Sequence, residues 1–147
     1  MTIESTTGDL LKADVDALVN TVNTVGVMGK GLALQFKKTF PDVFSTYSIA
    51  CKKGEVSTGK MHIVTRTSSP KYIVNFPTKQ HWRNPSKLEY IEYGLDDLVK
   101  QTQVLGISSI AIPPLGCGYG GLSWSDVRPL IVQAFSAYPN LRILLFE

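Results

Sequence analysis

Short apolar runs alternate with longer segments of helical spacing along the whole chain, and this alternation limits the possible folds more than any other feature. Five of the runs, at residues 17–19, 61–64, 72–74, 110–112 and 143–146, are interpreted as buried strands. Strands that alternate with helices are typical of one architecture class. The predicted fold class is therefore α/β.

The helical segments differ in how clearly their ends are marked. Residues 32–40 and 43–53 have helical spacing, and both helices are expected to be amphipathic. Residues 86–89 read Ser-Lys-Leu-Glu, which matches a capping box at the start of a longer helix. Another helix is expected over 124–137, where Pro129 removes an amide and should leave the first turn irregular or 3₁₀.

Length and composition set the remaining bounds. The chain has 147 residues, the size of one average domain, and no apolar run approaches the roughly 20 residues that span a bilayer. No membrane association is expected, and without a secretory signal the cytoplasm is the expected compartment. Two cysteines and two histidines lack the spacing of a metal cluster, so neither a metal nor a cofactor is expected. Glu147 directly follows an apolar run, which suggests that residues 1–147 are one domain trimmed from a longer protein.

A loop rich in glycine and asparagine follows the apolar run at 17–19. Residues 20–31 read Asn-Thr-Val-Asn-Thr-Val-Gly-Val-Met-Gly-Lys-Gly and precede a helix, so that backbone amides and the helix N-terminus can meet a phosphate. The loop is not a Walker A motif, because Gly31 stands where a magnesium-binding Ser or Thr is needed. A turn with capping residues is the alternative interpretation.

A second loop of the same kind lies at residues 113–122, again between a strand and a helix. It reads Pro-Pro-Leu-Gly-Cys-Gly-Tyr-Gly-Gly-Leu and contains a literal G-x-G-x-x-G. A dinucleotide-binding fold should carry that motif after its first strand with an acid about 20 residues later, so this assignment is strained. Two such loops in a small domain suggest a ligand with two phosphates, held by amides.

Together these segments resemble a macrodomain. The resemblance is carried by Gly8-Asp9-Leu10-Leu11, the 20–31 loop and the 116–122 loop, and it covers nearly the whole chain. It implies a mixed central sheet between helices and a site for ADP-ribose. In that site Asp9 would accept from the adenine amino group, the amides of 116–121 would hold the diphosphate, and Asn23 would face the distal ribose. The residues implied as ADP-ribose ligands are Asp9, Leu10, Asn20, Gly29, Lys30, Gly31, Leu115, Gly116, Cys117, Gly118, Tyr119, Gly120, Gly121 and Phe146.

Some of these residues have plainer interpretations. Asp9 also fits a helix cap or turn residue, and Phe146 fits core burial at least as well as a contact with adenine. Cys117 has no histidine spaced to activate it and is interpreted as a small packing residue.

Within macrodomains, residues 20–38 and 75–83 look like the DarG antitoxin branch. Members of this branch remove ADP-ribose that the partner toxin DarT attaches to thymine in single-stranded DNA. The resemblance therefore implies a hydrolase acting on ADP-ribosylated single-stranded DNA, with ADP-ribose as ligand and a cognate DarT toxin as partner.

Lys79 is the expected catalytic residue, together with Asn23. It follows Pro77 at the end of an apolar strand, where desolvation and a cation such as Lys30 or Arg83 would lower its pKa. A neutral amine there can attack the anomeric carbon of the ribose or hold the opened sugar. Alternatively the cation only stabilises charge on the ribose or departing base, or Lys79 is an ordinary surface lysine.

One position departs from the eukaryotic relatives of this branch. They place an aspartate in the second glycine loop as a partner to the lysine, and Gly120 stands at the matching position here. An acid–base pair copied from those relatives is therefore not expected, and protein-carboxylate substrates are in doubt.

His81, Trp82 and Arg83 follow the lysine and are the expected DNA-binding residues, because such a trio can stack on a base and contact phosphate. Core burial is an equal alternative for Trp82. Lys37 and Lys38 are better explained as a solvated helix face than as a DNA track. Two other functions stay open: a reader that only binds ADP-ribose, and a dinucleotide-binding fragment.

Overall fold

The computed structural model describes residues 2–138 and 140–147, in which six strands form one mixed sheet. The strands are β1 (Thr2–Thr6), β2 (Ala17–Val22), β3 (His62–Thr65), β4 (Tyr72–Pro77), β5 (Ser109–Ile112) and β6 (Arg142–Phe146). Their order across the sheet is β1-β6-β5-β2-β4-β3, and only the β3–β4 pair is antiparallel among the described strands. The mixed sheet predicted from the sequence is confirmed.

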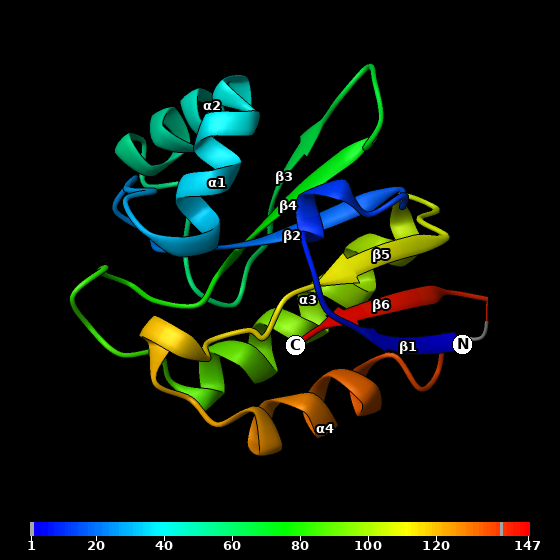
Figure 1. Ribbon diagram of the computed structural model, residues 1–147. Helices are drawn as coiled ribbons and strands as arrows, with labels where there is room; N and C mark the ends of the chain where they lie inside the picture. The colour runs from blue at the N-terminus through cyan, green and yellow to red at the C-terminus, as the bar shows by residue number, and fades with distance from the viewer. Residues whose placement is uncertain (1, 139) are drawn as a thin grey trace.

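Helices cover both faces of the sheet. They are α1 (Gly31–Thr39), α2 (Pro41–Lys52), α3 (Leu88–Val104) and α4 (Trp124–Ala134), and two 3₁₀ turns, η1 (Leu10–Lys12) and η2 (Gly118–Gly120), lie in loops. Figure 1 shows α1 and α2 together on one face and α3 and α4 on the other. In the described part of the chain, no helix has both the length and the apolar character needed to cross a membrane.

The alternation of side chains along each strand explains the two layers. On β2, Ala17 and Val19 join the core under α3 and α4, whereas Leu18 joins the core under α1 and α2. A third apolar cluster, which includes Val22, Met28 and Tyr47, lies between α2 and the loop after β2. Strands β2, β4, β5 and β6 are buried on both faces, which is why the sequence shows them as continuous apolar runs, whereas the edge strand β1 is largely exposed.

Two local predictions were wrong. Ser86 does not cap α3: the N-cap is Lys87 without a side-chain hydrogen bond, and Ser86 instead bonds through its backbone N to the Gly120 carbonyl at 2.9 Å. Pro129 does not disturb the first turn of α4, which is α-helical from Trp124. The carbonyl that loses its partner belongs to Ser125, an exposed residue whose carbonyl water can reach.

Candidate functional site

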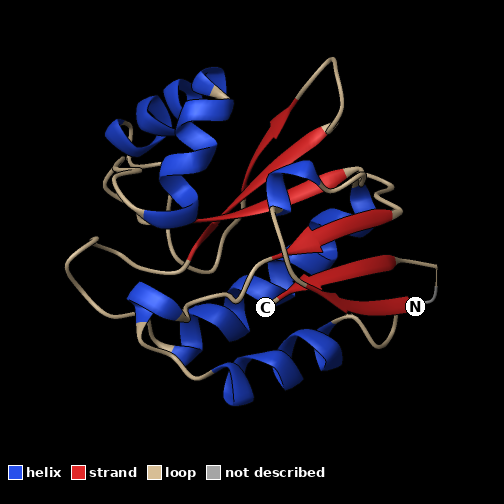
Figure 2. Cartoon of the chain, viewed as in Figure 1, coloured by secondary structure: helices blue, strands red, loops and turns tan. Residues whose placement is uncertain are grey.

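The loops that follow β2, β4 and β5 meet at one edge of the sheet and form a cleft of about 830 Å³. These three strands are parallel neighbours, so their carboxyl ends lie together. Figure 2 shows the three loops on the same side of the molecule. Clefts of this size at the carboxyl ends of parallel strands are the usual ligand sites of α/β proteins.

The first glycine loop directs the N-terminus of α1 into the cleft. Gly31, Leu32 and Ala33 line the cleft as the first residues of the helix. Lys30 is the N-cap, with extended backbone and no side-chain cap, so the first amides of the helix are free for a ligand. An anion is favoured there by the free N–H groups and by the helix dipole.

Asn23 lines the cleft from the same loop, but most of its side chain is used to shape the loop. Its Oδ1 accepts from the Val25 amide at 3.1 Å, the Val27 amide at 3.3 Å and the Tyr47 hydroxyl at 2.8 Å. Its Nδ2 donates to the Val27 carbonyl at 2.8 Å. One Nδ2 hydrogen is left for a ligand.

Tyr47 anchors this arrangement from α2. The side chain is fully buried, and its hydroxyl also approaches the Asn23 carbonyl at 2.7 Å. Burial raises the pKa of the phenol, which therefore acts as a neutral hydrogen-bond donor.

The second glycine loop contributes main chain to the opposite wall. Gly116 has a φ of +73°, and a Cβ there would lie 2.6 Å from Leu122 Cδ1, so only glycine fits. The amides of Gly118 and Tyr119 open the η2 turn and, as the first N–H groups of a helical turn, are available to a ligand. The cleft thus has two walls of backbone donors.

Lys79 lies between these walls, just past the end of β4. Its Nζ donates to the Tyr119 carbonyl at 3.1 Å and to the Trp82 carbonyl at 3.4 Å. Desolvation lowers the pKa of Lys79, and the charge of Lys30 lowers it further. Lys30 rather than Arg83 is therefore the cation that lowers the pKa of this amine.

Gly120 leaves no space for a side chain beside Lys79. A Cβ at residue 120 would lie 2.5 Å from Ser86 Oγ and 4.0 Å from Lys79 Cε. Ser86 is buried, and its hydroxyl has no hydrogen-bond partner among the described residues. Ser86 thus occupies the place that an acidic side chain at residue 120 would need.

The loop after β4 forms an exposed aromatic and cationic rim, made of His81, Trp82 and Arg83. Trp82 lines the cleft and is 43% exposed, so it is not a core residue. The Arg83 guanidinium lies 4.6 Å from the Trp82 ring centre, and the His81 ring lies 5.1 Å from it. Arg83 lines the cleft, whereas His81 is not part of the lining.

Most of the predicted site residues come together in the cleft, and several do not. Those that line it are Asn23, Gly29, Lys30, Gly31, Lys79, Trp82, Arg83, Gly116, Cys117, Gly118, Tyr119, Gly120 and Gly121. Those outside its lining are Asp9, Leu10, Asn20, His81, Leu115 and Phe146. Leu10 and Phe146 are buried in one apolar cluster, and Leu115 is buried in another. Asp9 caps η1 by accepting from the Leu11 amide at 3.0 Å.

Asn20 belongs to a buried polar chain beneath the cleft. Its Nδ2 donates to Asn75 Oδ1 at 3.2 Å, and Asn75 Nδ2 lies 3.1 Å from His62 Nδ1. The Asn20 side chain is fully buried, so its place is in the support of the site. In the sequence, Asn75 was noted only as the first residue of the 75–83 segment, and His62 carried no signal beyond its position in an apolar run.

Other cleft residues were missed from the sequence. The lining also includes Thr21, Val22, Val27, Leu32, Ala33, Thr78, Asn84, Pro85, Pro113 and Pro114. Pro113 and Pro114 could have been found, because they lie in the same loop as Gly116. Tyr47 contacts Asn23, and Ser86 packs against Gly120, from other parts of the chain. Nothing in the sequence around Tyr47 or Ser86 indicates these contacts.

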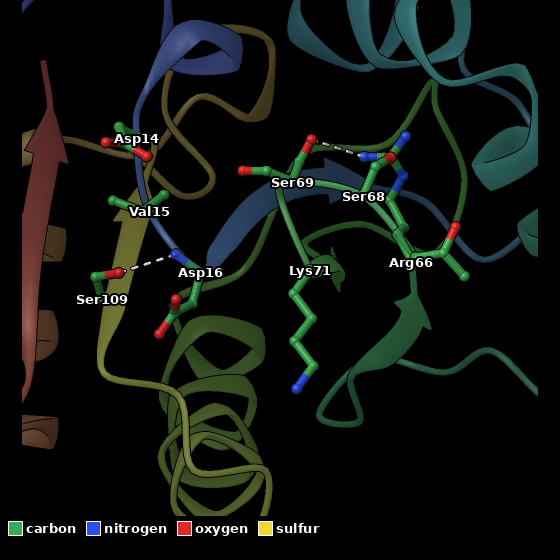
Figure 3. Close-up of a pocket in the computed structure, with 9 residues that line it drawn as sticks. Asp14, Val15, Asp16, Arg66, Ser68, Ser69, Lys71 and Ser109 are labelled. Atoms are coloured by element: carbon green, nitrogen blue, oxygen red, sulfur yellow. Dashed lines mark hydrogen bonds between the residues drawn. The ribbon is translucent and has the colours of Figure 1, made fainter.

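A second hollow, of about 390 Å³, lies at the opposite edge of the sheet. Figure 3 shows Asp16, Lys71 and Ser109 around it, with the Asp16 amide donating to Ser109 Oγ at 2.8 Å. Arg66, also in its lining, donates to the Ser69 carbonyl at 3.4 Å. Among the described residues, no group of three His, Cys, Asp or Glu side chains is placed to hold a metal ion.

The fold and the two-walled cleft define a class, and comparison with known proteins agrees: the family model described as Macro domain matches residues 19–131, so the chain belongs to this family. It is 55% identical to the DNA ADP-ribosyl glycohydrolase of Mycobacterium tuberculosis over 95% of this chain and 40% of that protein. The chain therefore spans well under half the length of this relative.

Solved structures give the same result. The macrodomain of Mycobacterium tuberculosis DarG superposes with a TM-score of 0.96 at 54% identity, covering 99% of this chain and 97% of that one. Thermosipho africanus DarTG, solved in complex with ADP-ribose, superposes with a TM-score of 0.92 at 38% identity, covering 99% of this chain and 42% of that one.

Proposed function

We propose that this chain is a hydrolase that removes ADP-ribose from ADP-ribosylated thymidine in single-stranded DNA and thereby acts as the antitoxin to a DNA ADP-ribosyltransferase. The observation that carries the proposal is Lys79, whose amine lies between two walls of backbone donors and has a lowered pKa. The relative from Mycobacterium tuberculosis is named DNA ADP-ribosyl glycohydrolase. That name supports the DNA substrate, and for an enzyme acting on DNA we propose the cytoplasm as the compartment.

The two walls suit the ligand's diphosphate. The α1 N-terminus and the η2 turn offer amides from opposite sides, and Lys30 adds a positive charge. The distal ribose then lies toward Asn23 and Lys79. Asp9, Leu10 and Phe146 lie together beyond the cleft lining, where we place the adenine.

Lys79 acts on the glycosidic bond between the anomeric carbon of the distal ribose and thymine. In the route favoured by its lowered pKa, the neutral amine attacks this carbon, a C–N bond to Lys79 forms, and the thymine nitrogen leaves with the bonding electrons. Water then replaces the amine on carbon, and its proton balances the charge on the base. With no side chain at Gly120, water carries the protons.

His81, Trp82 and Arg83 serve DNA in this proposal. Trp82 offers an exposed ring for a base, and Arg83 offers a cation next to it for a phosphate. A relative from Thermosipho africanus, 43% identical, is named as a fusion of DNA ADP-ribosyl transferase and DNA ADP-ribosyl glycohydrolase. That name supports a functional pairing between this enzyme and a transferase of the DarT type.

The test compares wild type with Lys79→Ala on an oligonucleotide that contains one ADP-ribosylated thymidine. We expect Lys79→Ala to release ADP-ribose about 100-fold or more slowly and to bind ADP-ribose with wild-type affinity in calorimetry. Lys60→Ala, at an exposed lysine outside the cleft lining, is the matched control and should retain full activity.

Undiminished turnover by Lys79→Ala contradicts the catalytic role. Tight ADP-ribose binding by wild type without release from DNA or protein linkages would instead identify a reader module. A preference for NAD over ADP-ribose would indicate a dinucleotide-binding protein.

A further inference from the structure

The Tyr119 backbone contributes to the cleft, but its aromatic side chain has no role in the proposed reaction. Its ring is 72% exposed, although it stands on a loop whose other residues contribute main chain to the cleft. An exposed ring of this size forgoes the favourable free energy that burial of an aromatic side chain provides. The ring at the cleft mouth is therefore a candidate binding surface.

The ring is held in place across the cleft. The position of a Cβ on Gly31 lies 3.3 Å from Tyr119 Cε2, so the ring edge lies against the first residue of α1. The Lys30 ammonium lies 5.6 Å from the ring centre. Tyr119 thus bridges the two glycine loops while most of its surface faces outward.

Lys79 connects the main chain of Tyr119 to that of Trp82. Its Nζ donates to the backbone carbonyls of both residues. Both exposed rings therefore belong to residues whose backbone contacts this amine. In the proposed reaction, a base linked to the ribose at Lys79 lies near both residues.

The charge around the two rings suits a polyanion. The charged residues that line the cleft are Lys30, Lys79 and Arg83, and no carboxylate lines it within the described residues. Exposed aromatic rings interleaved with cations are the usual means of binding single-stranded nucleic acid without sequence preference.

We infer that the Tyr119 side chain is a stacking platform for the nucleobase next to the modified thymidine, on the side of the cleft formed by α1. It makes the enzyme prefer a DNA strand to an isolated ADP-ribosylated nucleoside. Trp82 serves the neighbouring base on the other side. This inference rests on the proposed function for its substrate.

The experiment measures kcat/KM on three substrates: ADP-ribosylated thymidine, the same group within a short oligonucleotide, and that oligonucleotide with abasic sites flanking the modified thymidine. The quantity of interest is the oligonucleotide-to-nucleoside ratio of kcat/KM. Stacking contributes about 1–3 kcal/mol per base, so Tyr119→Ala should lower this ratio about 5- to 150-fold. Tyr119→Phe should keep the wild-type ratio, since the ring remains.

The abasic substrate shows whether the effect of Tyr119 comes from the neighbouring bases or from the phosphates. The ratio of kcat/KM on the abasic oligonucleotide to kcat/KM on the nucleoside should be the same for wild type and Tyr119→Ala, because the base that would stack on the ring is absent. Tyr93→Ala is the matched control, since Tyr93 is 64% exposed on α3 outside the cleft lining, and it should keep the wild-type ratio. An unchanged ratio in Tyr119→Ala, or a lowered ratio in Tyr119→Phe, overturns the inference.

Binding of an unmodified fluorescent oligonucleotide gives an answer independent of catalysis. Tyr119→Ala should bind it at least about fivefold more weakly than wild type and Tyr119→Phe do. Equal affinity overturns the inference. If wild type cleaves no substrate, the proposed function fails, and this measurement alone still decides the role of Tyr119.

Discussion

At the scale of single residues, Lys79 is defined by what surrounds it. Two backbone carbonyls hold its amine in position, while desolvation and Lys30 favour the neutral form. In the proposed reaction Lys79 thus acts as a nucleophile without a carboxylate partner, for which Ser86 and Gly120 leave no room. The lysine therefore depends on its cationic neighbour.

This dependence predicts a shift in the pH profile. If neutral Lys79 attacks the sugar, kcat on the DNA substrate rises with pH and levels off above the pKa of Lys79, which lies below the ordinary 10.5. Lys30→Gln removes a positive charge that lowers this pKa, so the midpoint should move to higher pH. Lys60→Gln should leave it in place. A midpoint that does not move in Lys30→Gln argues for the purely electrostatic role.

Ser86 and Gly120 yield a prediction about stability. Gly120→Ala puts a methyl group 2.5 Å from Ser86 Oγ, and such overpacking should lower the free energy of unfolding by about 1–3 kcal/mol. In a Ser86→Gly background the same substitution should cost much less. Denaturant unfolding of the four proteins measures this coupling, and strictly additive effects would show that the two residues do not compete for space.

At the scale of elements, α3 can approach β4 closely because of one glycine. Gly94 faces Phe76, and a Cβ there would overlap the Phe76 ring. This contact sets how closely α3 packs on β4, and just before α3 the Ser86 amide donates to the Gly120 carbonyl of the second glycine loop.

Gly94→Ala is therefore expected to destabilise the protein, although alanine favours a helix over glycine by about 1 kcal/mol. The steric overlap should outweigh this gain and lower the free energy of unfolding by about 1–3 kcal/mol. Thermal and denaturant unfolding measure the change. Gln103→Ala on the exposed side of α3 is the control, and a Gly94→Ala protein as stable as wild type would contradict the packing described.

Periodicity was sufficient to predict most of the elements, but not the contacts between them. The apolar runs gave β2 to β6 to within a few residues, because strands with buried faces have little polar content. None of the runs matched β1, whose residues are mostly polar and exposed. Ser86 matched a capping box locally, yet a hydrogen bond to Gly120, 34 positions away, uses it differently. The glycine loops were visible because their chemistry is local, whereas Tyr47 reaches Asn23 across 24 positions.

At the scale of the whole molecule, a buried polar chain connects the edge of the sheet to the floor of the cleft. Asn75 accepts from Asn20, which orients its amide so that Nδ2 faces His62. His62 Nδ1 must then be an unprotonated acceptor. Burial lowers the pKa of His62 accordingly.

The protein should therefore lose stability in mild acid. Above pH 6.5, the ordinary value for histidine, His62 is neutral in both the folded and the unfolded state. As the pH falls below 6.5 toward the lowered folded pKa, only the unfolded state takes up the proton, so stability falls. Unfolding curves between pH 7 and 5 should show a smaller loss for His62→Gln than for wild type. Equal losses would mean that His62 does not titrate differently on folding.

The two walls of the cleft have a consequence for how such a protein evolves. Hydrogen-bond donors that belong to the main chain are not removed by exchanging side chains, except where a glycine is replaced or a proline is introduced. The amide donors of the two walls are thus little affected by most point mutations, whereas the rim side chains of Trp82 and Tyr119 change with any substitution at those positions. If the walls bind the diphosphate as proposed, lineages can change what ADP-ribose is attached to without rebuilding the part that binds it, and an inhibitor bound to those amides would leave few routes to resistance.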